Sequence, residues 1–261
     1  MEDLDTRFTV PIGSVVVALI DPTPGFEAEF DAWYGRDHFY TAGLAAPGVF
    51  SAARFVATRA AKTLRRPTDS GVAGDPDRGS HLALYYVLPG HDDDRVAFAT
   101  EQVALAAADD RLFRERDHLH TWSYEPVGSV QSARGVPAAL ALDRRYPTLT
   151  VVLVDLEAPS ADGELLSRWA GADDDPASGL CLRPSYEVMP SAWIGPFDPA
   201  RRRLLLELRD EPIDRAWSTG RWRAAPLEDA GVARVVWGSP VEAKVVGVET
   251  VAYTQIRAHR T

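Results

Sequence analysis

The sequence predicts an α+β fold built from two successive units, each with the order strand, helix, strand, strand, helix, strand. Short β-branched runs alternate with segments of helical periodicity. The same order of segments returns in the second half of the chain. Over 261 residues, 46% are hydrophobic and 25% are charged, which is typical of a globular chain with a sizeable core. Within each unit the order is the ferredoxin-like one.

The first unit is expected over residues 1–130. The run SVVVALI at 14–20 predicts a strand that is buried on both faces, and Asp21-Pro22 ends it. A helix should follow from Phe26, because apolar residues then recur at helical spacing as far as Leu44. The other predicted elements are strands at 49–57, 82–88 and 118–124, a polar loop at 58–80 and a helix at 95–116.

The second unit is expected over residues 131–261. Its predicted elements are strands at 148–156, 180–188, 203–208 and 232–237, and helices at 163–170 and 213–230. Setting Trp169 on Trp33 and Trp237 on Trp122 aligns the two units as a tandem duplication. In this alignment Ser185 stands where the first unit has Arg54, and the single histidine of the second unit is His259, in the tail. We therefore expect the second unit to be a structural partner without chemistry of its own.

Composition excludes several classes of protein. A formal net charge of -10 repels phosphate backbones and anionic lipids, so neither nucleic acid nor a membrane is an expected partner. The single cysteine, Cys181, leaves no intramolecular disulfide and no thiolate zinc site. The start is acidic, unlike a signal peptide, and no apolar run reaches about 18 residues, so we expect a cytoplasmic protein.

A parallel, doubly wound sheet is the alternative architecture. Such a sheet needs a helix after nearly every strand, whereas the second and third predicted strands follow each other without one. The chain also has no G-x-G-x-x-G after its first strand and no G-x-x-x-x-G-K-[ST] motif. NAD and ATP are therefore not expected ligands.

The segment EAEFDAWYGRDHFYTAGLAAPGVFSAARF, at 27–55, contains Trp33-Tyr34, His38, Pro47-Gly48-Val49 and Arg54-Phe55. It resembles the dimeric α+β barrel superfamily, especially the EthD-like branch. The resemblance implies that antiparallel sheets of ferredoxin-like units pair into a barrel, here within one chain, and it leaves room for a homodimer of such chains. It also implies a range of chemistries: polyketide cyclases, cofactor-free monooxygenases, muconolactone isomerases, haem enzymes and ligand-binding modules.

Histidines that could transfer protons near neutral pH are concentrated in the first unit. The resemblance favours His38 as the catalytic base or acid, because the EthD-like pattern has its histidine there; the alternative is a residue that caps the helix end. Tyr34, one helical turn earlier, and Arg54 would orient the substrate or stabilise an oxyanion.

Five further side chains are expected to bind the substrate: Trp33, His81, Tyr85, His120 and Trp122. Strand alternation places His118, His120, Trp122 and Tyr124 on one face of the last strand of the unit. His118 and His120 could also help to hold a metal, but no metal-binding motif accompanies them. Nothing marks a haem ligand either, so neither a metal nor another cofactor is expected.

These observations lead to a prediction of function. We expect a cofactor-independent enzyme doing acid–base chemistry, of the cyclisation, dehydration, isomerisation or lyase type, on an aromatic or unsaturated carbonyl compound. One alternative is a cofactor-free monooxygenase that uses the same base. The other is a module that binds a small ligand without turnover.

Overall fold

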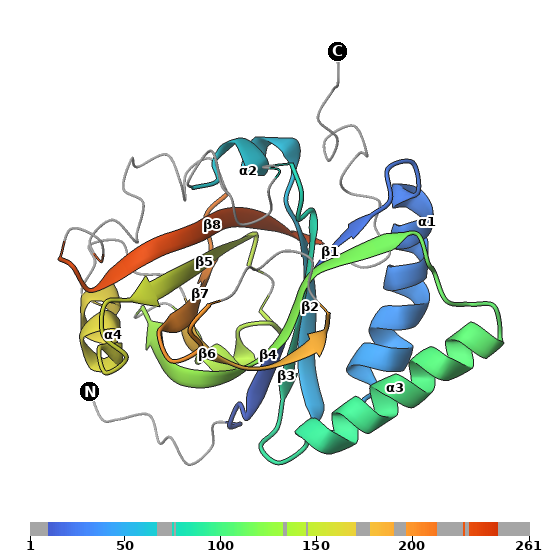
Figure 1. Ribbon diagram of the computed structural model, residues 1–261, viewed down its shortest axis with the longest axis horizontal. Helices are drawn as coiled ribbons and strands as arrows, with labels where there is room; N and C mark the ends of the chain where they lie inside the picture. The colour runs from blue at the N-terminus through green and yellow to red at the C-terminus, as the bar shows by residue number, and fades with distance from the viewer. Residues whose placement is uncertain are drawn as a thin grey trace.

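Eight antiparallel strands form a closed barrel in the computed structural model, which describes residues 10–66, 75, 77–132, 135–144, 146–170, 178–190, 197–212, 227 and 230–244 (Figure 1). The strands are β1 (Ser14–Pro22), β2 (Val49–Val56), β3 (His81–Val87), β4 (Arg116–Gln131), β5 (Thr148–Leu156), β6 (Ser178–Met189), β7 (Arg202–Arg209) and β8 (Ala233–Lys244). Around the barrel their order is β1-β3-β2-β8-β5-β7-β6-β4.

Two junctions close the barrel between the first and second halves of the chain. Strand β4 pairs with β6 over a long ladder, whereas β2 and β8 pair over only three residues each. All pairings between the described strands are antiparallel. The predicted α+β class with an antiparallel sheet is therefore confirmed, and the parallel alternative is excluded.

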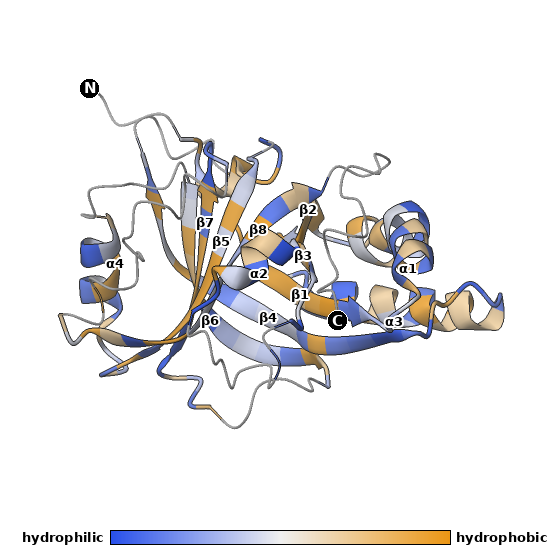
Figure 2. Ribbon diagram, turned by 90° about the horizontal axis from the view of Figure 1, so that it is seen from above, coloured by the Kyte–Doolittle hydropathy of each residue, from blue (hydrophilic) through white to orange (hydrophobic). Residues whose placement is uncertain are grey.

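Helices cover the barrel on two opposite sides, as Figure 2 shows. On one side lie α1 (Glu27–Trp33), its π-helical continuation η2 (Tyr34–Leu44) and α3 (Asp92–Ala108). On the other side lies α4 (Asp162–Ala170). Two short elements, α2 (Arg59–Thr63) and the 3₁₀ helix η3 (Ala138–Leu140), complete the described helices. No helix in these described ranges has the length and apolar character needed to cross a bilayer.

Two predicted helices differ from the sequence interpretation. The helix expected at 95–116 begins earlier and ends at Ala108, followed by Asp110 in the left-handed region with φ 53°. This backbone conformation stops the helix, and Arg116 already belongs to β4. The helix expected at 213–230 lies largely outside the described residues.

Alternate side chains of β1 pack into two different hydrophobic cores. Val15, Val17 and Leu19 pack inside the barrel, and Ala18 and Ile20 pack outside it against the helices. This arrangement confirms the prediction that the first strand is buried on both faces. Burying such side chains contributes roughly 25 cal/mol per Å² of apolar surface removed from water.

A register shift in β4 changes which of its side chains share a face. Leu19, inside the barrel, pairs with His120, whereas Ile20, outside it, pairs with His118, so Leu119 is the extra residue of a bulge. The prediction that His118 shares a face with His120 is therefore wrong.

The second half of the chain has a similar shift, next to Leu153, and Trp237 is the residue that pairs with Leu153. In the first half of the chain, the residue next to the shift is Leu19, which pairs with His120. Relative to the two shifts, Trp237 therefore occupies the ladder position of His120, two residues away from that of Trp122.

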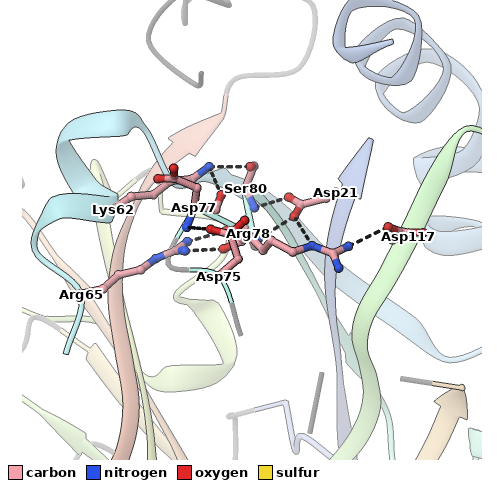
Figure 3. A network of polar contacts seen from close by, with 9 residues as sticks. Asp21, Lys62, Arg65, Asp75, Asp77, Arg78, Ser80 and Asp117 are labelled. Atoms are coloured by element: carbon pink, nitrogen blue, oxygen red, sulfur yellow. Dashed lines mark hydrogen bonds and ion pairs between the residues drawn. The ribbon is translucent and has the colours of Figure 1, made fainter. Parts of the chain in front are cut away.

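Polar contacts anchor the segment between β2 and β3 (Figure 3). The sequence predicts a loop at 58–80, but Arg59–Thr63 form the helix α2, whose start is capped by the Thr58 side chain as it accepts a hydrogen bond from the Ala61 N–H. The Lys62 Nζ donates to the Asp77 carbonyl oxygen at 2.5 Å and to the Ser80 Oγ at 2.8 Å. Arg65 Nη2 donates to the carbonyl oxygen of Gly79 at 2.6 Å. The Asp21 carboxylate accepts hydrogen bonds from the backbone N–H groups of Gly79 and Ser80. This network fixes the chain immediately before β3 and therefore fixes the backbone position of its first residue.

Candidate functional site

A pocket lies between the α1–η2 helix and the outer face of β1, β2 and β3, and its side chains are packed so closely that no water molecule fits between them as they stand. Its lining residues are Ala18, Ile20, Phe30, Tyr34, Arg54, His81, Leu82 and Ala83. Small-molecule sites typically measure roughly 300–1,000 Å³, so any small-molecule ligand requires the surrounding side chains to move apart.

Strand alternation and residue size explain why a hollow forms here. Ala18 on β1 and Ala83 on β3 are paired across the sheet, and both point toward the helices. Their small side chains leave space that the larger outward-facing side chains surround. His81 and Tyr85 project to the same outer side from alternate positions of β3.

A pair of buried tyrosines and an arginine form one wall of the site. The hydroxyl groups of Tyr34 and Tyr85 are 3.0 Å apart and hydrogen-bonded. The guanidinium carbon of Arg54 lies 4.6 Å from the centre of the Tyr34 ring. Burial raises the pKa of Tyr34 and also that of Tyr85, so both phenols stay protonated at neutral pH and can donate hydrogen bonds.

Asp31 lies between Arg54 and His81 and contacts both side chains. Arg54 Nη2 donates to Asp31 Oδ1 at 3.0 Å, and the same oxygen is 3.8 Å from His81 Nδ1. Burial lowers the pKa of His81 to about 3, against the opposing attraction of Asp31. Neither ring nitrogen of His81 has a hydrogen-bond partner in the described part of the chain. The pocket therefore contains a neutral imidazole with unused hydrogen-bonding capacity.

His38 lies beside this pocket but not in its lining. Its ring stacks on Trp33 with centroids 4.6 Å apart and lies 5.2 Å from the Tyr34 ring, as the helical spacing of Tyr34 and His38 predicted. Arg116 covers Trp33, with its guanidinium carbon 4.7 Å from the ring centre. Burial and the nearby Arg116 lower the pKa of His38 to about 4.

His120 and Trp122 lie elsewhere, inside the barrel. The rings are stacked at 6.0 Å, and His120 Nε2 is 2.7 Å from the Tyr124 hydroxyl. Trp122 also contacts Phe197, at 5.2 Å between ring centres. Because β1 separates the interior from the pocket, the structure does not bring these two residues to the cavity that Tyr34, Arg54 and His81 share. The reason is strand alternation: His120 and Trp122 pair with Leu19 and Val17, which face the interior of the barrel, whereas the pocket lies on its outer face.

Sequence reasoning missed two charged residues that contact the site. Asp31 lies three residues before Tyr34 on the same helix, a spacing that periodicity could have identified. Lys244 ends β8, pairs with Arg54 across the junction of β2 and β8, and forms an ion pair with Asp31 Oδ2. Only the order of strands around the barrel brings Lys244 to this position, so no local pattern could have shown it.

The described residues contain no group of three His, Cys, Asp or Glu side chains able to hold a metal ion. His118 cannot act together with His120, because they project from opposite faces of β4. Instead, His118 Nδ1 lies 2.9 Å from the Thr121 hydroxyl oxygen.

Gly43 allows the helix to approach the tyrosine pair closely, and we expect Gly43→Ala to disturb it. A Cβ at this position would lie 2.4 Å from Cε1 of Tyr85, so the ring must move. We expect a loss of about 1–3 kcal/mol in the free energy of unfolding, measured by urea denaturation. Gly163→Ala in α4 is the matched control, because a Cβ there meets no atom within 4 Å. Equal stability of the two variants would contradict the close contact.

Comparison with known proteins gives a fold but no family. No protein-family model matches the chain, and no curated protein is significantly similar to it. The chain is similar to the crystal structure of an anthrone oxidase-like protein, with a TM-score of 0.51 and 13% identity, covering 92% of this chain and 95% of that one.

Two further crystal structures are similar, both of proteins named putative monooxygenase. The one from Lactobacillus acidophilus has a TM-score of 0.48 and 7% identity, over 89% of this chain and 94% of that one. The one from Fusobacterium nucleatum has a TM-score of 0.47 and 9% identity, over 92% and 94%. At such low identity, the likeness to the anthrone oxidase-like protein shows the fold alone, an α+β barrel that one chain closes.

Proposed function

We propose that this protein is a small-molecule enzyme that abstracts a proton next to a carbonyl group, without a dissociable cofactor. One observation carries the proposal: a single pocket joins a neutral imidazole, a buried phenol and a guanidinium group, contributed by His81, Tyr34 and Arg54. These groups are a base, a hydrogen-bond donor and a fixed positive charge, which enolate formation requires. Cyclisation, dehydration, isomerisation and lyase reactions can all begin with this step.

His81 is the base in this mechanism. Asp31 lies near its Nδ1, which favours the tautomer protonated there and leaves the lone pair on Nε2. Nε2 takes the proton from carbon, and the attraction of Asp31 stabilises the imidazolium that results. The carbonyl oxygen becomes negatively charged and accepts a hydrogen bond from Tyr34, while Arg54 supplies positive charge. The imidazolium then returns the proton to the product or to a leaving group.

His38, the base expected from the EthD-like resemblance, has a different place in this proposal. Its ring packs between Trp33 and Tyr34, beside the pocket. We propose that it holds the Tyr34 ring in position and that Trp33 supports it from outside. Tyr85 orients the Tyr34 hydroxyl through their hydrogen bond.

We further propose that residues 1–130 and 131–261 are duplicated ferredoxin-like units of the EthD-like type. The ladders support an equivalence of β1 with β5, because both strands have nine residues and a register shift after the sixth. With β1 and β5 aligned, Tyr85 corresponds to Glu207, since these residues pair with Val16 and Thr150. In the second half, Trp169 Nε1 donates to Glu207 Oε1 at 2.6 Å, in the manner of the tyrosine pair.

The same equivalence supports a single active pocket. The two alanines that leave the hollow, Ala18 and Ala83, correspond to Val152 and Leu205, whose larger side chains are buried. Arg54 corresponds to Cys181 rather than to Ser185. The second half thus has the larger side chains where the first has the pocket.

Proton exchange tests the proposed function directly. The protein should exchange the methyl protons of acetophenone or para-acetylbenzoate for deuterium in D₂O, followed by NMR. Tyr34→Phe should lower the exchange rate about 100-fold, because it removes the donor to the developing oxyanion. Tyr86→Phe is the matched control, since Tyr86 is buried inside the barrel on the same strand as Tyr85. Absence of exchange with the wild-type protein and both ketones would refute the proposal.

The second candidate function is a cofactor-free oxygenase. The anthrone oxidase-like protein that shares the fold favours it, as do the aromatic rings around the pocket. The same base would form a carbanion that reacts with oxygen. Oxygen uptake by the purified protein in the presence of an anthrone would distinguish this candidate from simple proton transfer, and saturable binding without either reaction would indicate a binding module.

A further inference from the structure

Two cations share one carboxylate beside the pocket. Arg54 lines the cavity, and Lys244, its neighbour across the junction of β2 and β8, lies behind it. Both contact Asp31, Arg54 through Oδ1 and Lys244 through Oδ2. The side chains are 4%, 10% and 14% exposed for Arg54, Lys244 and Asp31 respectively, so water screens these charges poorly.

The other nearby charges do not restore neutrality. His81 is buried and neutral at pH 7. The carboxylate of Asp21, the other acid that acts on His81, accepts hydrogen bonds from the N–H groups of Gly79 and Ser80 and contacts Arg78. Among the residues that the structure describes, the charges of Arg54, Lys244 and Asp31 therefore sum to about +1, which a buried site tolerates only at a cost in free energy.

Hydrogen-bonding groups facing the pocket are also unused. Within the described residues, the guanidinium of Arg54 hydrogen-bonds only through Nη2. His81 has two ring nitrogens without partners, although it is almost fully buried. A guanidinium fork fits the two oxygens of a carboxylate better than any other common group. Charge and geometry together indicate the same kind of ligand.

We propose that the pocket selects substrates that carry a carboxylate, bound by Arg54, and that Lys244 is the specificity-determining residue because it keeps Asp31 from neutralising Arg54. The substrate class is then an aromatic or unsaturated carbonyl compound with a carboxylate group. In such a substrate Arg54 pairs with the carboxylate, and Tyr34 is the group that donates to the developing oxyanion. This inference rests on the proposed function, since it concerns the same pocket. Through Lys244, at the end of β8, the second half of the chain would also contribute a residue to the site. Lys244 is one of only two lysines among 28 basic residues.

Binding of benzoate and of benzamide, measured by isothermal titration calorimetry, tests the inference. The two probes have nearly the same shape and differ in charge. The wild-type protein should bind benzoate at least about tenfold more tightly than benzamide. Lys244→Gln should abolish this preference and leave the Kd of benzamide unchanged, because Asp31 is then free to neutralise Arg54. Lys244→Arg, which keeps the charge, should retain most of it, and thermal melting would verify that both variants fold.

Two more variants separate a local effect from overall charge. Arg234→Gln removes a cation from the same strand, but Arg234 is 67% exposed and pairs with Asp155, so the preference for benzoate should persist. Asp31→Asn should strengthen benzoate binding, because it removes the competing carboxylate. It should also weaken proton exchange, because His81 loses its orienting acid. This opposite response of binding and turnover is not expected from a purely structural residue.

The outcomes distinguish this inference from the proposed function. Equal binding of the two probes by the wild-type protein, binding of neither, or an unchanged preference in Lys244→Gln would overturn the carboxylate site. Exchange of acetophenone protons in any of these cases would leave the proposed function intact. Conversely, selective benzoate binding without any proton exchange would support the carboxylate site and refute the enzyme.

Discussion

Replacing His81 by glutamine is expected to lower the rate of proton exchange by about 100-fold or more, the range for loss of a general base. Glutamine keeps a polar side chain of similar length but cannot accept a proton at neutral pH. His81 lines the pocket, is neutral and lies near an acid that stabilises its protonated form. The measurement is kcat for deuterium exchange into para-acetylbenzoate, with a thermal melt to establish that the variant is folded.

His38→Gln is the informative comparison for this experiment. His38 is also buried and neutral at pH 7, but it stacks on Trp33 outside the pocket lining. We expect a decrease of less than about tenfold, caused by movement of the Tyr34 ring. A larger loss in His38→Gln than in His81→Gln would reverse the assignment of the base and favour the residue that the sequence resemblance indicated.

The second large effect is expected on stability, which should collapse on mild acidification. His81 and His120 have pKa values lowered by burial to about 3, and burial and Arg116 lower that of His38 to about 4. Histidine in an unfolded chain titrates near 6.5, so between about pH 6.5 and 4 the unfolded state binds protons that the folded state does not. The free energy of unfolding therefore falls as the pH falls through this window and is constant, for these groups, above it.

The size of this pH dependence determines the pH at which the protein should unfold. Each of these histidines contributes a slope of about 1.4 kcal/mol per pH unit, so three give about 4 kcal/mol per unit. A typical domain has about 5–15 kcal/mol in total, so a protein with about 5–10 kcal/mol should unfold between about pH 5.5 and 4. Circular dichroism at stepwise pH measures the midpoint. His120→Gln should make urea stability less dependent on pH by one proton, and a free energy of unfolding that does not fall between pH 6.5 and 4 in the wild-type protein would contradict the histidine burial described above.

Local patterns in the sequence predicted the strands and their class. The β-branched run of β1 and the helical stripe from Phe26 each depend on neighbouring residues, so periodicity identified them. The bulge in β4 depends on the hydrogen bonds with β1, and no residue of HLHTWSY marks it. Alternation therefore grouped His120 with Trp122 and Tyr124 correctly but placed His118 on the wrong face, and it does not show that the shared face is the interior of the barrel. The end of α3 at Ala108 likewise depends on one backbone angle, the positive φ of Asp110.

The candidate site was predictable only in part. Tyr34 and His38 are neighbours on one helix, and their spacing alone predicts that they lie side by side. The approach of Arg54 and His81 to Tyr34 depends on strand order, which the ferredoxin-like pattern implies. The ion pair of Lys244 with Asp31 required knowledge of which strand edges meet, and repeat symmetry does not provide it.

The short ladder between β2 and β8 has a consequence for biosynthesis. Arg54 and Lys244 are separated by 190 positions, from 54 to 244, yet they are paired neighbours in this ladder. A ribosome that has released only the first half has made His81, Tyr34 and Arg54 but not the ammonium group that completes their electrostatic surroundings. Contacts so distant in sequence form late and slowly. The charge arrangement on which the proposed carboxylate site depends is therefore complete only after β8 has been synthesised.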